Sequence, residues 1–243
     1  MPMATITVTP GRVLSLGNSW DYNTSEDILK WQHNIATEKN LVLPKASGKG
    51  IKVELAAPTF PWRDLLGELF VRSTGAGKPS RATYQGSLSG LQFAAGDDED
   101  FEYHIPHDYA TGTHLHLHVH WSHINAFVNG GTITFTYAMS YAKSHNQAPF
   151  PAEVGTTFVG TASTTRYQHM LTEVQVSATS PSANQIDSDD VEPDGVIMLR
   201  LEMTTNNITV SEGAVPDPFI HYVDIHYQST NIGTKDKAPD FYA

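Results

Sequence analysis

Hydrophobic and polar residues alternate with a period of two along several stretches of the chain. The clearest stretches are Thr113–Trp121, Thr132–Ala142, Leu171–Val176, Val196–Met203 and Ile220–Gln228. Such alternation places successive side chains on opposite faces of a strand, one toward a core and the other toward solvent. Turn residues separate the stretches, and the few helical patterns leave no helical crossovers between strands. The pattern predicts an all-β fold, namely an antiparallel β-sandwich or a jelly roll.

The remaining patterns are weaker and predict at most two short helices. Ser25–Ala36 begins with a capping serine followed by acidic residues, and Pro61–Val71 has proline in its first turn, although Gly67 weakens it. Further strands are indicated at Ala4–Thr9, Ile51–Ala56 and Leu91–Ala94. We expect residues 1–57 to form an N-terminal arm or attachment segment and residues 58–243 to form the β-sandwich domain.

The spacer Asn125–Gly131 joins two of the clearest strands. It contains Asn129-Gly130-Gly131, which is typical of a tight turn between antiparallel strands. Thr113–Trp121 and Thr132–Ala142 are therefore expected to pair as a hairpin. The threonines at alternate positions of the second strand would then lie beside the histidines of the first.

The amino-acid composition excludes several classes of function. The 243 residues include no cysteine, which excludes disulfides, thiolate nucleophiles and iron–sulfur clusters. The net charge of −11 argues against a nucleic-acid-binding surface. No run approaches the roughly 20 apolar residues that cross a bilayer, so no membrane association is expected. The first residues lack a basic leader and an apolar run, so we expect synthesis in a cytoplasm without secretion.

Four of the twelve histidines lie in one predicted strand. His114, His116, His118 and His120 occupy every second position, while Leu115, Leu117, Val119 and Trp121 lie between them. The apolar set is expected to face the core, and the four imidazoles form a row on the other face.

A His-x-His pair on a strand offers two nitrogen ligands to a transition metal such as Zn, Fe, Ni or Cu. The other ligands must come from a second strand or from other subunits; in a trimer, one such pair from each chain would supply six nitrogens. Asp224 and His226 share the non-core face of a later strand. The candidate ligands of a structural transition metal are His116, His118, His120, Asp224 and His226. The alternatives are a polar or interface strand, in which His114 would contact another subunit, and a catalytic site.

Sequence motifs of common enzymes are absent. The chain contains no GxSxG, P-loop, GxGxxG or HExxH motif. His118-Val119-His120 is not followed by the acidic residue that cupin enzymes place a few positions later. The acidic runs Asp97–Asp100 and Asp187–Asp190 are typical of solvated loops. We therefore predict no catalytic residues and no organic cofactor.

Three motifs together resemble a family of virion structural proteins of tailed bacteriophages and prophages. They are a W-x-D-L start, a PHDY-x-x-G-T segment leading into the H-x-H-W strand, and a late D-I-H-Y strand. The matching residues are Trp62, Asp64, Leu65, Pro106, His107, Asp108, Tyr109, Gly112, Thr113, His118, His120, Trp121, Asp224, Ile225, His226 and Tyr227. The resemblance covers residues 58–243.

The resemblance implies a non-enzymatic component of the neck, collar, capsid decoration or tail, assembled in the host cytoplasm and located in the virion. Its partners would be copies of itself, as a trimer, and other capsid, portal or tail proteins. Phe241 and Tyr242 near the C-terminus would suit docking on a neighbouring subunit. Two other functions remain open from the residues: a jelly-roll enzyme with His118, His120 and His226 as metal ligands, and a carbohydrate-binding module for host-surface glycans.

Overall fold

The computed structural model describes residues 20–23, 28–31, 60, 62–70 and 77–230. The chain divides into two compact units, Met1–Gly50 and Ile51–Ala243. The predicted strands Ala4–Thr9 and Ile51–Ala56 and the residues Phe241 and Tyr242 lie outside the described residues. No helix in the described part of the chain is long and apolar enough to cross a membrane.

The described part of the first unit is a two-stranded antiparallel sheet. Strand β1 (Trp20–Asn23) pairs with β2 (Ile28–Trp31), with Trp20 opposite Trp31. The helix predicted over Ser25–Ala36 is therefore wrong at Ile28–Trp31. Capping and first-turn residues express a local preference, and pairing with a neighbouring strand overrides it.

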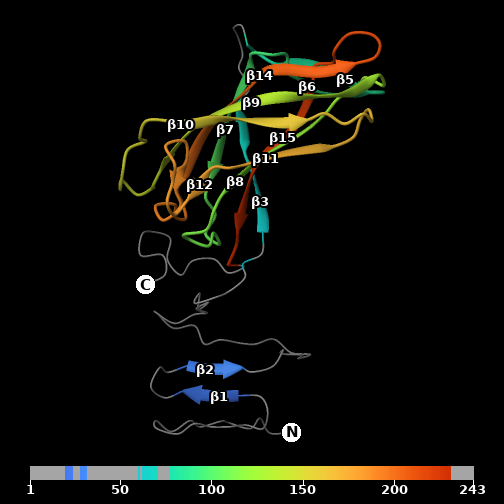
Figure 1. The fold of residues 1–243 in the computed structure, drawn as a ribbon. Helices are drawn as coiled ribbons and strands as arrows, with labels where there is room; N and C mark the ends of the chain where they lie inside the picture. The colour runs from blue at the N-terminus through green and yellow to red at the C-terminus, as the bar shows by residue number, and fades with distance from the viewer. Residues whose placement is uncertain (1–19, 24–27, 32–59, 61, 71–76, 231–243) are drawn as a thin grey trace. The chain divides into compact units, whose positions relative to one another are not determined.

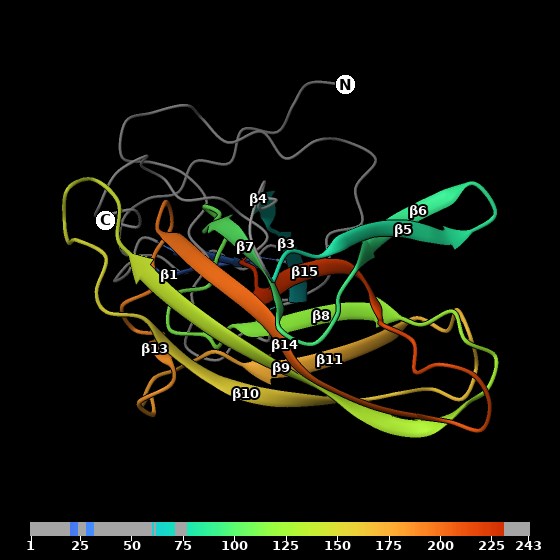
Figure 2. The same cartoon turned by 90° about the horizontal axis from the view of Figure 1, so that it is seen from above.

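The second unit contains two main sheets (Figure 1, Figure 2). The five-stranded sheet has the order β10 (Val154–Thr161), β9 (Val128–Ala142), β14 (Val196–Val210), β7 (Asp97–His104) and β4 (Glu68–Phe70). The six-stranded sheet has the order β11 (Met170–Gln175), β8 (His116–Ser122), β15 (Phe219–Gln228), β6 (Leu88–Gln92) and β5 (Ser80–Gln85), and β3 (Trp62–Leu66) also pairs with β15. All of these pairs are antiparallel; the short strands β12 (Ser177–Ala178) and β13 (Ile186–Asp187) pair in parallel. The prediction of an all-β antiparallel sandwich is confirmed.

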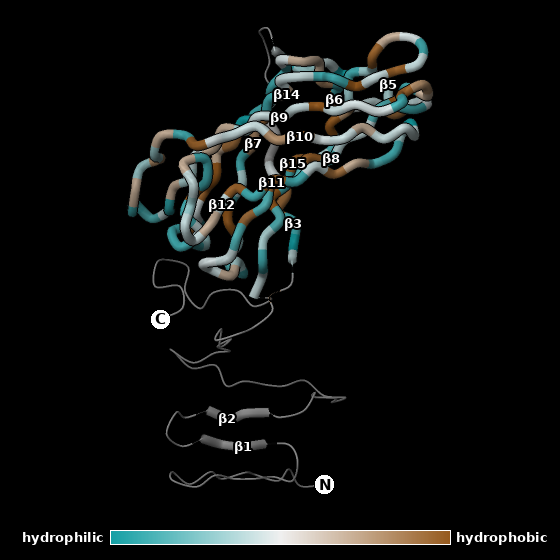
Figure 3. Tube along the Cα trace, in the orientation of Figure 1, coloured by the Kyte–Doolittle hydropathy of each residue, from teal (hydrophilic) through white to brown (hydrophobic). Residues whose placement is uncertain are grey.

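A single hydrophobic core lies between the two sheets. Leu117, Val119 and Trp121 of β8 are fully buried, as are Phe135 and Ile133 of β9. The alternation of hydrophobic and hydrophilic positions along the strands is visible in Figure 3. The aliphatic face of the histidine strand is thus the core face, as its pattern predicts, and its histidines point away from the core.

The predicted hairpin between Thr113–Trp121 and Thr132–Ala142 is wrong. Strand β8 belongs to the six-stranded sheet and β9 to the five-stranded sheet, so the chain crosses between sheets in the segment 123–127. Asn129-Gly130-Gly131 lies inside β9, not in a turn. Gly131 passes so close to β14 that a Cβ atom there would lie 2.2 Å from the carbonyl oxygen of Asn207. Gly131 therefore allows β9 and β14 to pack closely, whereas the sequence Asn-Gly-Gly alone suggests a turn.

The helix predicted over Pro61–Val71 is also wrong, because β3 and β4 occupy this range. Strand β3 pairs with β15 and β4 pairs with β7, so the chain passes from one sheet to the other at Gly67. A Cβ atom at Gly67 would lie 2.5 Å from the Tyr103 ring. The glycine that weakens the helix in the sequence marks this crossing in the structure.

Candidate metal centre

Four neighbouring strands bring polar side chains together on the outer face of the six-stranded sheet. Their order is β11, β8, β15 and β3, and their register aligns side chains in rows across the sheet. Read from β11 to β3, the rows are Leu171, His120 and Tyr222; Glu173, His118, Asp224 and Leu66; and Gln175, His116, His226 and Asp64. The histidine row therefore has carboxylates on both neighbouring strands.

The most buried part of this face is a first triad, formed by His118, His120 and Asp224. One potential ligand atom from each residue lies within 4.8 Å of the other two. Nδ1 of His118 lies 3.7 Å from Oδ2 of Asp224, and Nε2 of His120 lies 2.9 Å from Oδ1. Asp224 is only 2% exposed, and neither of its carboxylate oxygens has a hydrogen-bond partner among the described residues. A buried carboxylate without a donor is costly, so this arrangement favours a cation.

A second triad shares His118 and adds Asp64 and His226. Nε2 of His226 lies 3.6 Å from Oδ1 of Asp64, and the rings of His118 and His226 meet edge to face at 4.7 Å between centroids. The Trp62 ring packs beside His226, 4.9 Å away between centroids. The two triads therefore place four candidate ligands around His118: His120, Asp224, Asp64 and His226.

Two residues outside the triads orient the imidazoles of the first triad. His118 contacts Glu173 through Nε2 at 2.7 Å, and His120 contacts His169 through Nδ1 at 2.8 Å. When each ring donates its proton in these hydrogen bonds, its other nitrogen carries a lone pair that faces Asp224. Metal-bound histidines commonly donate their second N–H to a carboxylate in this way, which sets both tautomer and ring orientation.

Burial sets the protonation of the site. It raises the pKa of Asp224, although the neighbouring His120 and His118 partly offset that effect. Burial likewise lowers the pKa of His120, opposed by the Asp224 carboxylate, and lowers the pKa of His116, opposed by Glu173. The lowered pKa of His120 favours the neutral imidazole that binds a metal, whereas the raised pKa of Asp224 opposes the carboxylate form that a metal needs.

Nitrogen and carboxylate donors in this combination suit a divalent transition metal such as zinc. Ligand atoms at roughly 2.0–2.2 Å from one ion, at right or tetrahedral angles, lie roughly 2.9–3.6 Å apart. The separations of 2.9 Å and 3.7 Å within the first triad lie close to that range. Small side-chain adjustments would place His118, His120 and Asp224 around one ion.

Four of the five predicted ligands, His118, His120, Asp224 and His226, belong to the triads. His116 lies on the same face but outside both triads, with its ring edge-to-face against Trp62 at 5.3 Å between centroids. His114 lies beside Gln175, within 3.1 Å, and its predicted role at a subunit interface stays a prediction. The alternative of a jelly-roll enzyme requires His118, His120 and His226 to bind one metal. Instead, His120 belongs to the first triad and His226 to the second, and only His118 belongs to both.

Sequence reasoning missed Asp64, Glu173 and His169. The local pattern around Asp64 predicts a helix, and Glu173 is only one polar position of a strand pattern. The period-two alternation of Leu171–Val176 does place Glu173 on a non-core face, but nothing in the sequence identifies β8 as its neighbour. His169 precedes β11 in a loop and has no periodic signal.

A second group of histidines surrounds Asp194, in the loop before β14. Nε2 of His107 lies 2.9 Å from its Oδ1 atom, with His104 at 3.3 Å, and Nε2 of His145 lies 3.0 Å from Oδ2. Burial raises the pKa of Asp194, but the hydrogen bond from His145 and the nearby His107 and His104 outweigh it, so that the pKa is lowered. These contacts connect three loops at one end of the sandwich.

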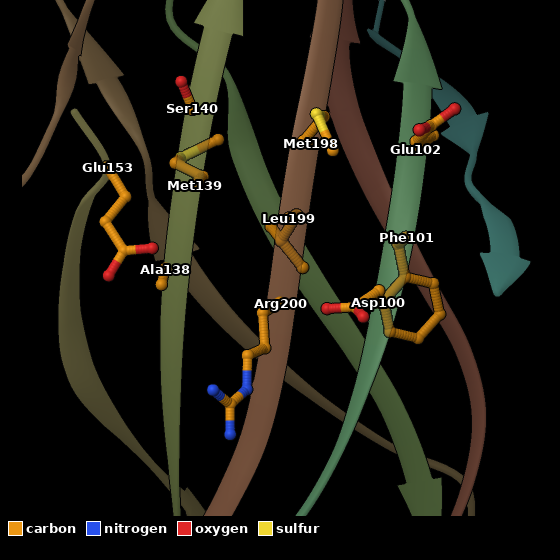
Figure 4. Close-up of a pocket in the computed structure, with 10 residues that line it drawn as sticks. All are labelled: Asp100, Phe101, Glu102, Ala138, Met139, Ser140, Glu153, Met198, Leu199 and Arg200. Atoms are coloured by element: carbon orange, nitrogen blue, oxygen red, sulfur yellow. The ribbon is translucent and has the colours of Figure 1, made fainter. Parts of the chain in front are cut away.

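The outer face of the other sheet carries a pocket of about 430 Å³ (Figure 4). Figure 4 shows Arg200 of β14 between Ala138 of β9 and Asp100 of β7. Arg200 is held by Asp98, with 2.6 Å between Nη2 and Oδ2. The positive charge of Arg200 is therefore paired within the sheet. No candidate metal-binding group among the described residues lies there.

Comparison with known proteins identifies no family. No protein-family model matches the chain, and no curated protein matches it. A family 11 carbohydrate-binding module from Clostridium thermocellum, solved with a β-1,3-1,4-mixed-linked tetrasaccharide, is 14% identical, covers 73% of this chain and 94% of its own, and has a TM-score of 0.29. The C-terminal family 22 module of Clostridium thermocellum Xyn10B is 12% identical over 70% of this chain and 87% of its own, with a TM-score of 0.22. TmCBM61 with β-1,4-galactotriose is 14% identical over 69% and 86%, with a TM-score of 0.21.

Proposed function

We propose that this chain binds a divalent transition-metal ion on the outer face of its six-stranded sheet, in a structural and non-enzymatic role. The observation that carries the proposal is the Asp224 carboxylate, which is buried and faces two imidazoles without accepting a hydrogen bond from the described residues. An ion between these three side chains would compensate the buried charge.

The position of the site supports a structural role. The ligands of the two triads come from the paired strands β3, β8 and β15, whose backbones are already held by the sheet. An ion there would connect neighbouring strands and stabilise the native state by the free energy of its binding. Because all these ligands come from one chain, we expect one ion per chain, whereas an axial site in a trimer would hold one ion per three chains.

We further propose that the protein is an oligomeric component of a bacteriophage virion, in the neck, capsid decoration or tail. Contacts among the three motifs of the resemblance support this proposal. Asp108 accepts hydrogen bonds from Tyr227 at 3.0 Å and from Ser229 at 2.6 Å, and pairs with Arg63 at 3.0 Å. Residues from the W-x-D-L, PHDY and D-I-H-Y segments thus meet at one carboxylate, as expected if the motifs specify one structural unit.

The metal proposal is tested on the untagged full-length protein. After dialysis against EDTA, calorimetric titration with Zn²⁺ should give about one ion per chain, and the loaded protein should melt at a higher temperature than the metal-free protein. His120→Gln should abolish stoichiometric binding. His114→Asn is the matched control, since His114 belongs to the same row but contacts Gln175, and it should bind normally. Unchanged Zn²⁺ binding by His120→Gln would contradict the proposal.

The virion proposal needs its own measurement. Native mass spectrometry of the full-length protein should show a trimer, and labelled antibody against the protein should decorate purified particles of the phage that encodes it. A monomer that is absent from particles contradicts this proposal and leaves the metal site to be judged by titration alone.

A further inference from the structure

A continuous series of aromatic rings crosses the outer face that holds the two triads. It starts at Trp62 on β3 and ends at Tyr167 in the loop before β11. Neighbouring rings lie 4.7–6.4 Å apart between centroids, in the order Trp62, His226, His118, His120, His169, His221, Tyr84 and Tyr167. Tyr222 lies beside the series, 6.3 Å from His120. We call these nine residues the aromatic strip.

Two rings of the strip are largely exposed, Trp62 at one end and Tyr222 beside His120. Trp62 is 45% and Tyr222 is 60% exposed, so both rings are accessible to a ligand. Trp62 is opposite Gln228 near one end of β15, and Tyr222 lies near the other end. Six residues of a strand separate them along β15, which corresponds to about 20 Å at the usual rise per residue.

Polar groups lie between and beside the exposed rings. His169 and His221 are exposed, and the side chain of Glu173 is half exposed. Tyr84, at the far end, shares a hydrogen-bonded group with Ser122 and His221, in which Ser122 Oγ lies 2.9 Å from the Tyr84 hydroxyl and 2.8 Å from His221 Nε2. The face therefore alternates flat apolar surfaces with hydrogen-bonding groups along one direction.

We propose that the aromatic strip binds an extended, neutral polysaccharide. A sugar ring has an apolar face that packs on an aromatic ring and hydroxyl groups at its edge that exchange hydrogen bonds with polar side chains, and this strip offers both along its length. Charge selects the neutral class: Asp64, Glu173 and Asp224 lie on this face, and the chain carries a net charge of −11, so a polyanion would be repelled.

Polysaccharide binding at the aromatic strip would not require a metal ion. Trp62 and Tyr222, which would stack on sugar rings, belong to neither triad. Binding should therefore be the same for metal-free and Zn²⁺-loaded protein. Polysaccharide binding that appears only with Zn²⁺ and is unaffected at Trp62 would overturn stacking as the mechanism while supporting the metal proposal.

The test is affinity electrophoresis of the full-length protein in native gels that contain mixed-linked β-glucan, galactan, mannan or dextran. At least one polysaccharide should retard the protein, and Trp62→Ala or Tyr222→Ala should weaken that retardation about tenfold or more. Trp62→Phe and Tyr222→Phe keep a ring and should retain most of the binding. Phe150→Ala removes an exposed aromatic ring from the β9–β10 loop, away from the strip, and should change nothing.

Three results would overturn the proposal. In the first, none of the four polysaccharides retards the protein. In the second, both alanine variants bind as tightly as the unmodified protein while melting normally. In the third, the alanine variants change the oligomeric state in sedimentation velocity, which would make the strip an interface between copies of this chain.

Discussion

The Nε2 atom of His120 lies 2.9 Å from the Oδ1 atom of Asp224, yet that oxygen accepts no hydrogen bond from the described residues. Two ligands of one ion at right angles, each about 2.1 Å from it, would lie about 3.0 Å apart. This separation is therefore compatible with the shared metal ion proposed above. An ion shared by these two side chains would make the free energy of unfolding depend on metal.

Asp224→Asn should lower the free energy of unfolding when Zn²⁺ is bound but not in metal-free protein. In metal-free protein, removal of the buried charge should leave stability unchanged or increase it by up to about 1–3 kcal/mol, the typical cost of an unsatisfied buried polar group. In the presence of Zn²⁺, the variant should lose the stabilisation that the ion provides. Urea unfolding with EDTA and with Zn²⁺ measures both values. A variant that is strongly destabilised in EDTA would show that the carboxylate has protein partners instead.

Glu173→Gln should weaken Zn²⁺ binding without abolishing it. Glu173 contacts Nε2 of His118 at 2.7 Å and lies outside the first triad, so its charge acts on the metal through the imidazole. Loss of such outer partners typically lowers metal affinity about 10–100-fold. Calorimetric titration measures the change. Glu153→Gln on the other sheet is the control, and an equal effect of both substitutions would point to general electrostatics.

The Asp194 cluster should contribute stability that disappears in acid. The lowered pKa of Asp194 means that its ionised form is favoured in the folded state. This contribution is complete above the ordinary pKa of 3.8 and is lost as the pH falls through the lowered value. Asp194→Asn should therefore cost up to about 1 kcal/mol at neutral pH, as expected for partly exposed ion pairs. The difference from the unmodified protein should shrink in urea titrations as the pH falls below 3.8. A constant difference across this range would mean that Asp194 acts through its backbone geometry.

Gly67→Ala should destabilise the sandwich at the crossing between β3 and β4. The added methyl group would lie 2.5 Å from the buried Tyr103 ring, whose hydroxyl donates a hydrogen bond to the carbonyl of Val223. Overpacking of this kind typically costs about 1–3 kcal/mol. Thermal and urea unfolding measure the loss. In a Tyr103→Leu background the same substitution should cost much less, and strictly additive effects would show that the clash is relieved in another way.

The sequence predicted those parts of the fold and site that depend on alternation within one strand. His118 and His120 alternate with buried Leu117 and Val119, and this pattern alone places both imidazoles on the outer face. The same reasoning placed Asp224 correctly. Alternation within a strand does not show which strands pair with one another or in which register.

Register in this site depends on an irregularity between Ile220 and Tyr222, which shifts the pairing of β15 with β8 so that Asp224 lies opposite His118. Such a bulge has no reliable sequence signal when the glycine that often marks it is absent. The position of Asp64 depends on pairing between β3 and β15, far apart in the sequence, and the local pattern around Pro61 suits a helix. The positions of Asp224 opposite His118 and of Asp64 both depend on pairing between strands far apart in the sequence. The sequence therefore predicts that His118 and His120 share a face, but not which side chains lie beside them.

The ligands of the two triads come from positions near both ends of the described sandwich, Asp64 on β3 and Asp224 and His226 on β15. Strand β15 is the last described strand, so during synthesis none of the complete triads exists until nearly the whole second unit has emerged and its non-local strands have paired. Non-local β pairing is slow compared with local structure formation. High-affinity metal uptake would then mark the end of folding, and the time course of Zn²⁺ binding after dilution from denaturant would report when the last strand joins the sheet.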